Sequence, residues 1–165
     1  MMGRDATSAT SAGTHLRGRW LLLARVGWVA VAALALAIFV ASLPGAYALS
    51  ETLCHTVGCS NNDQLTSAAL KQLRGVNLSL AFFAGYVVGL KSVTMLVFMA
   101  AAAVIFWRAS ADRVALVAAF TFVMFPLTAT HLASTVPAAW VLPAQILDVL
   151  GSSGMTLLFL TFPNG

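Results

Sequence analysis

The chain has 165 residues, of which 60% are hydrophobic and 8% are charged, with nine Lys or Arg residues against five Asp or Glu residues. A soluble domain of this size needs a polar surface that this composition does not supply, so the mean hydropathy of +0.91 indicates a lipid bilayer as the solvent. The length leaves no room for an ordinary catalytic domain beside a membrane domain, and the scattered basic residues argue against nucleic-acid binding.

The N-terminal residues 1–19 are rich in Ser, Thr, Ala and Gly and show no apolar periodicity, which is typical of a disordered tail. We expect the membrane domain to cover 20–165 and its first span to cover 21–43. A basic flank, an apolar run and small residues after Pro44 also imitate a cleavable signal peptide. Because the apolar run is long for a signal peptide, a retained anchor is the favoured interpretation.

The stretch 44–77 is the one sizeable hydrophilic piece outside the predicted spans, and it contains both cysteines, Cys54 and Cys59. Outside the cytoplasm we expect them to form a disulfide, which stabilises so small a loop by about 2 kcal/mol in the chain-entropy model. A redox-active pair, or a metal site that also uses His55, is the alternative. The spacing matches no zinc or haem pattern.

A short amphipathic helix is predicted at the end of this loop. Apolar residues recur at helical spacing from Gln64 to Arg74, and the polar residues at 61–63 offer an N-cap. We expect this helix to lie on the outer membrane interface and to lead into the second span.

Three further apolar stretches follow, at 76–107, 114–133 and 141–162. Each is long enough to cross a hydrocarbon core about 30 Å thick, so the predicted fold is all-α, a polytopic bundle of four transmembrane helices with one extracytoplasmic loop. The first of the three is too long for a perpendicular crossing and too short for two crossings. One tilted helix is expected there, with its span at about 78–107.

Proline should kink the third span at Pro126, where an interior helix loses a backbone hydrogen bond. Thr128 and Thr130 are close enough in sequence to satisfy the backbone groups that the proline frees.

The placement of basic and aromatic residues predicts the orientation. Arginines gather before and at the start of the first span and between the second and third spans, at positions 4, 17, 19, 25, 108 and 113. The side richer in Lys and Arg is normally cytoplasmic, so both termini are expected inside. Trp20 and Trp107 fall at the predicted inner boundary, and Tyr47 and Trp140 fall at the outer one. Trp28 fits neither belt and is expected to face lipid or to pack.

Two charged residues lie inside predicted spans, Lys91 and Asp148. Each would cost about 2.5–3.5 kcal/mol on insertion scales, and such residues usually face the interior of a bundle. Both fall in the outer half at similar depth, so one interpretation is a Lys91–Asp148 ion pair. In the other, each side chain reaches the outer interface independently.

The second span also contains Gly85 and Gly89 in a G-x-x-x-G pattern, which lets helix backbones approach closely. This pattern predicts either a dimer interface or packing inside one bundle. The fourth span has a similar small face at Gly151, Ser152 and Gly154. No phosphate loop, H-E-x-x-H, nucleophile elbow or Cys-x-x-Cys is present in the sequence, so we assign no catalytic residue, metal site or cofactor.

Four local features occur together: the outer-loop cysteine pair followed by Asp-Gln-Leu-Thr at 63–66, the run at 78–86, the run at 105–113 and Phe-Pro-Asn-Gly at 162–165. This series resembles the N-terminal membrane region of bacterial sensor histidine kinases, chiefly of the Chloroflexota type. The resemblance implies a bacterial membrane input module, within a larger sensor or standing alone. No kinase phosphoacceptor or ATP-binding motif is present, so kinase activity is not assigned, and Lys91 replaces the acidic residue expected there.

The sequence thus predicts an integral membrane sensory or anchoring module without catalysis of its own, in the bacterial plasma membrane. Its expected partners are the lipid bilayer and either a second copy of the chain or a signalling protein. One alternative is a membrane thiol-redox protein that uses Cys54 and Cys59, although such proteins usually need a second cysteine pair. The other is a small transporter subunit that uses Lys91 and Asp148.

Overall fold

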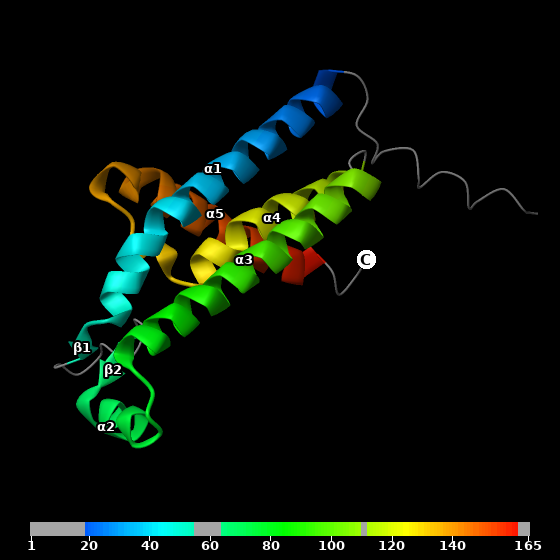
Figure 1. The fold of residues 1–165 in the computed structure, drawn as a ribbon. Helices are drawn as coiled ribbons and strands as arrows, with labels where there is room; N and C mark the ends of the chain where they lie inside the picture. The colour runs from blue at the N-terminus through cyan, green and yellow to red at the C-terminus, as the bar shows by residue number, and fades with distance from the viewer. Residues whose placement is uncertain (1–18, 55–63, 110–111, 162–165) are drawn as a thin grey trace, which may run out of the picture.

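The structure, a computed structural model, describes residues 19–54, 64–109 and 112–161, and most of them lie in helices (Figure 1). The long helices are α1 (Arg19–Ser50), α3 (Leu80–Ala109), α4 (Arg113–Ala129) and α5 (Val141–Thr161). The smaller elements are β1 (Leu53–Cys54), β2 (Leu65–Thr66), α2 (Ser67–Gly75) and the 3-10 helices η2 (Leu132–Ser134) and η3 (Ala138–Trp140).

Among the described residues, three helices are long and apolar enough to cross a membrane, at Leu21–Ser50, Leu80–Ala109 and Ala138–Leu160. Only 11–28% of their most apolar windows is buried inside the protein, so most of their apolar surface faces outward. A helical membrane protein needs such a surface because lipid, not water, solvates it.

The predicted third span at 114–133 is not one continuous helix. Its helix α4 ends at Ala129 after 17 residues, which at 1.5 Å per residue is about 26 Å. His131 then adopts a left-handed conformation with φ 50°, and the chain continues in η2. A fourth membrane crossing therefore stays a prediction.

The core forms around α4, which packs against α1, α3, α5 and η2. Of the five largest fully buried side chains among the described residues, two lie on α4 and one each on α1, α3 and η2: Val123, Leu127, Ile38, Met95 and Leu132. Because its neighbours cover α4 on several sides, this helix carries the most buried face of the bundle.

Helix α1 continues past the predicted end of the first span at 43. Pro44 lies inside it, and the helix ends at Ser50, so the predicted loop at 44–77 includes part of a helix. The turn after η2 lies against this C-terminal part of α1, where a Cβ atom added at Gly45 would lie 2.2 Å from the backbone oxygen of Thr135. Tertiary contact thus supports the helix where local sequence predicts a break.

Pro126 lies inside α4 as expected, but the neighbouring hydroxyls do not serve the carbonyl of Phe122 that it frees. Thr130 Oγ1 donates to the carbonyl oxygen of Pro126 itself. Thr128 Oγ1 donates across to the Asp148 carbonyl oxygen of α5 at 3.2 Å. The expectation for these two threonines is therefore wrong, because one hydroxyl joins two helices instead.

The folded helical bundle has two opposite ends that differ in structure (Figure 1). Helix α1 begins, α3 ends and α4 begins at one of them, which carries Arg19, Arg25 and Arg108; we call it the basic end. At the opposite end, β1, β2 and α2 connect α1 to α3, and we call this group the cap.

Candidate functional site

The cap is built on a two-stranded parallel contact that follows directly from the end of α1. Leu53 pairs with Leu65 and Cys54 with Thr66. The Gln64 side chain also donates a hydrogen bond to Thr52 Oγ1. Two segments on either side of the cysteine loop are therefore tied together.

Cys54 is disulfide-bonded. Cys59, the only other cysteine in the sequence, lies outside the described residues, and so do His55 and the predicted N-cap at 61–63. The Cys54–Cys59 pairing stays a prediction. A structural disulfide at this point would close the loop between the two paired strands.

Helix α2 begins at Ser67, later than the predicted Gln64, because Leu65 and Thr66 pair with β1. Thr66 is the N-cap, and its hydroxyl oxygen accepts from the Ala69 amide at 3.2 Å. Helix α3 begins with a similar cap, in which the Phe82 amide donates to Ser79 Oγ at 3.1 Å. Both caps satisfy amides that the first turn of a helix leaves without a partner.

Lys91 is half-buried on α3 and lines a cavity of about 250 Å³ beside the C-terminal turn of α4. The cavity is also lined by Leu90, Thr94, Ala129, Thr130 and His131. A helix C-terminus carries partial negative charge on its last carbonyls, which favours a nearby ammonium group. The end of α4 is thus an electrostatically favourable neighbour for Lys91.

Asp148 is half-buried on α5 and lies near the same turn of α4, where its backbone carbonyl accepts from Thr128. Helices α3 and α5 both pack on α4 and make few direct contacts with each other. The structure therefore places Lys91 and Asp148 next to one turn of α4 but on different neighbouring helices. Their direct pairing stays a prediction.

The two glycine pairs lie in different surroundings. A Cβ atom added at Gly85 or Gly89 would meet no described atom within 4 Å apart from the adjoining turns of α3 itself, so neither glycine packs against another described element. A Cβ atom at Gly151 would lie 3.1 Å from the Met124 backbone, and one at Gly154 would lie 2.6 Å from Thr121 Oγ1. Close packing inside the bundle uses the glycines of α5.

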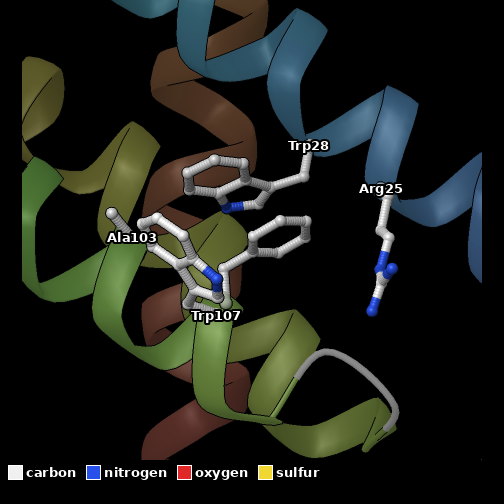
Figure 2. A pocket seen from close by; sticks show the side chains of 5 residues that line it. Arg25, Trp28, Ala103 and Trp107 are labelled. Carbon is white, nitrogen blue, oxygen red and sulfur yellow. The ribbon is translucent and has the colours of Figure 1, made fainter.

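An aromatic site at the basic end has no counterpart in the sequence prediction. Trp28 stacks on Phe106 with ring centroids 4.2 Å apart and an interplanar angle of 10°. This stack joins α1 to α3. Figure 2 shows Trp107 near Trp28 and Arg25 extending from α1. The one sequence feature that pointed toward this site was Trp28, which lies too deep in its predicted span for an interfacial belt.

Metal chemistry finds no support in the part of the chain that the structure describes, where no group of three or more His, Cys, Asp or Glu side chains could hold an ion. No protein-family model, curated protein or solved structure matches the chain.

Proposed function

We propose that this chain is an integral membrane sensory or anchoring module without catalysis of its own, and that the cap is its input surface. One observation carries the proposal: α1 and α3 both run from the cap to the basic end, and they are linked near both ends, through the strand pair of the cap at one and by direct contact at the other. The strand pair ties them at the cap, and the Trp28–Phe106 stack ties them at the other end.

Two helices of this length can transmit a displacement across a bilayer. Helix α1 has 32 residues and α3 has 30, or about 48 Å and 45 Å at 1.5 Å per residue. A ligand or partner that moves β1 against β2 would shift one helix relative to the other. Because packed interfaces tend to have discrete arrangements, such a shift favours switching at the far contact.

Orientation and location belong to the same proposal. The arginines of the basic end favour a cytoplasmic position for that end, and the cap would then face outward in a bacterial plasma membrane. A disulfide-bonded Cys54 fits an oxidising outer compartment. The resemblance of the sequence to sensor kinase membrane regions supports an input role, with a signalling protein or a second copy as partner.

The test measures coupling between the two ends in the full chain. Tryptophans labelled with 5-fluorotryptophan give separate ¹⁹F resonances, which Trp→Phe variants assign. Replacing Cys54 and Cys59 together by Ser should shift the Trp28 resonance, because the loosened cap changes how α1 lies on α3. Ala138→Ser, an exposed change in η3 outside the cap, is the control and should leave Trp28 unmoved. An unchanged Trp28 resonance in the double-serine variant would contradict the input role.

A small transporter subunit is the second candidate, and the cavity beside Lys91 favours it. Exchanging the charges, with Lys91→Asp and Asp148→Lys together, should abolish ion flux in vesicles if the residues carry a substrate, even when the protein stays folded. Full flux in the exchanged protein would contradict a transport site.

For the thiol-redox alternative, a Cys54 bond that resists mild reduction in thiol trapping would exclude a shuttling role.

A further inference from the structure

A cavity of about 370 Å³ lies between α1 and α3 at the basic end, lined by Arg25, Trp28, Ala103, Phe106 and Trp107. Its volume falls within the roughly 300–1,000 Å³ of small-ligand sites. Figure 2 shows the three aromatic rings gathered on one side and the Arg25 guanidinium apart from them. Apart from the arginine, the walls are carbon-rich side chains, so the cavity suits a molecule with an apolar body and a charged head.

Trp28 supplies an unused hydrogen-bond donor to this cavity. Its side chain is only 9% exposed, and Nε1 has no hydrogen-bond partner. Figure 2 shows this nitrogen on the edge of the indole ring that faces Trp107 and the cavity. A buried donor without an acceptor costs about 1–3 kcal/mol, so an acceptor delivered by a ligand would be favourable.

The charges at this end select the sign of the ligand head. Arg19, Arg25 and Arg108 are exposed here. The described acidic residue at this end, Asp112, caps α4, and its Oδ1 accepts from the Val114 amide at 3.1 Å. A guanidinium has five donors, so Arg25 can bind an anion in addition to any neighbour in the chain.

We propose that this cavity binds one anionic phospholipid from the surrounding bilayer. Arg25 holds the phosphate, the acyl chain lies along Ala103 and Phe106, and the Nε1–H of Trp28 donates to an ester carbonyl. Trp107 is 89% exposed, so its side chain has room to turn aside and admit the carbonyl.

Lipid is the occupant that the surroundings favour. Large apolar side chains next to the cavity residues on both helices are exposed, among them Leu22, Val26 and Val104. A lipid continues this apolar surface, whereas a hydrated soluble anion would lose water against carbon. Tryptophan and arginine at a helix end are also the side chains that suit the bilayer interface.

The experiment uses the full chain in phosphatidylcholine vesicles that contain a small fraction of brominated phosphatidylglycerol or brominated phosphatidylcholine, and it follows quenching of tryptophan fluorescence. The wild-type protein should be quenched more strongly by the anionic lipid. Arg25→Gln should lower this selectivity about fivefold, the factor that corresponds to about 1 kcal/mol per basic residue near a membrane surface.

Arg108→Gln is the matched control, since Arg108 is exposed at the same end but does not line the cavity. An equal loss of selectivity in both variants would mean general surface attraction and would overturn the site. Displacement of the quencher by inorganic phosphate would assign the cavity to a soluble anion and would also overturn it.

Trp28→Phe tests the hydrogen bond without removing the ring stack. Wild type should select ester-linked over ether-linked phosphatidylglycerol, because only the ester offers a carbonyl to Nε1. Trp28→Phe should abolish this preference, with Trp107 as the remaining fluorophore in the cavity. The same ester preference in both proteins would show that Trp28 binds no lipid carbonyl.

Discussion

The two glycine pairs of this protein have the same kind of sequence and opposite surroundings. Gly151 and Gly154 lie against α4, where an added Cβ atom would crowd the Met124 backbone and Thr121. Gly85 and Gly89 fit the G-x-x-x-G pattern better, yet outside the adjoining turns of α3 itself no described atom lies within 4 Å of an added Cβ atom there. A small residue in a membrane helix therefore indicates that close approach is allowed, and the fold decides where it occurs.

The largest loss of stability should come from adding a side chain at the closely packed glycines of α5, Gly151 and Gly154. Gly151→Leu places a side chain where the backbone of Met124 cannot retreat, so it should lower the free energy of unfolding by about 3 kcal/mol, the upper end for overpacking. Unfolding in mixed micelles followed by circular dichroism measures the change. Gly89→Leu, the matched control, should stay close to wild type. Equal losses in the two variants would remove the distinction between the pairs.

A third closely packed glycine, Gly45, lies where α1 meets the turn after η2. A Cβ atom at Gly45 would lie 2.2 Å from the backbone oxygen of Thr135, and backbone atoms cannot move aside cheaply. Gly45→Ala should lower the free energy of unfolding by about 2 kcal/mol through this clash. Ala48→Gly, on an exposed position of the same helix, is the control for helix propensity. Wild-type stability of Gly45→Ala in the same assay would contradict this close approach.

The hydrogen bond beside the packed pair should contribute less. Thr128→Val removes the hydroxyl that donates to the Asp148 carbonyl and keeps the shape of the side chain. The expected loss is about 0.6 kcal/mol, the average for hydrogen bonds between membrane helices. Thr156→Val is the control, because its hydroxyl donates only within α5, to Ser152. A larger loss for Thr156→Val would show that the contact between helices is not the stabilising one.

The smallest effect on the free energy of unfolding is expected at Gly85 and Gly89, the glycines of α3 with no close neighbour from another described element. Gly85→Leu and Gly89→Leu together should change the free energy of unfolding by less than about 0.5 kcal/mol, apart from any gain in helix propensity. Sedimentation equilibrium in detergent measures whether the same change weakens association of two chains. If wild type associates and the double variant does not, the open glycines form a contact between chains. A strong loss of monomer stability would instead place them inside the bundle.

Much of the helical architecture could be predicted from hydropathy, because a run of apolar residues as long as α3 has few alternatives to a membrane helix. Boundaries were harder. Pro44 is a poor helix interior by local rules, yet α1 continues through it where the turn at Thr135 packs alongside. The sequence predicts that the third span continues through residues 130–133, but α4 ends at Ala129 and His131 turns the chain with a left-handed conformation.

The candidate sites divide in a similar way. The sequence was enough to single out Lys91 and Asp148 as charges inside predicted spans, because charge is rare in such helices. Their placement beside the end of α4 depended on how three helices pack. The Trp28 cavity could not be found from sequence, since Arg25 and Trp28 on α1 meet Ala103, Phe106 and Trp107 on α3 only after folding.

By itself, then, the sequence determined the helical class and the lipid-facing character, because composition and the period of apolar residues act locally. It also determined the asymmetry of charge between the two ends. The tertiary structure alone decided which glycines pack, where helices end and which aromatic residues enclose a cavity. Those outcomes depend on contacts between residues far apart in the chain, whose free energies no local pattern contains.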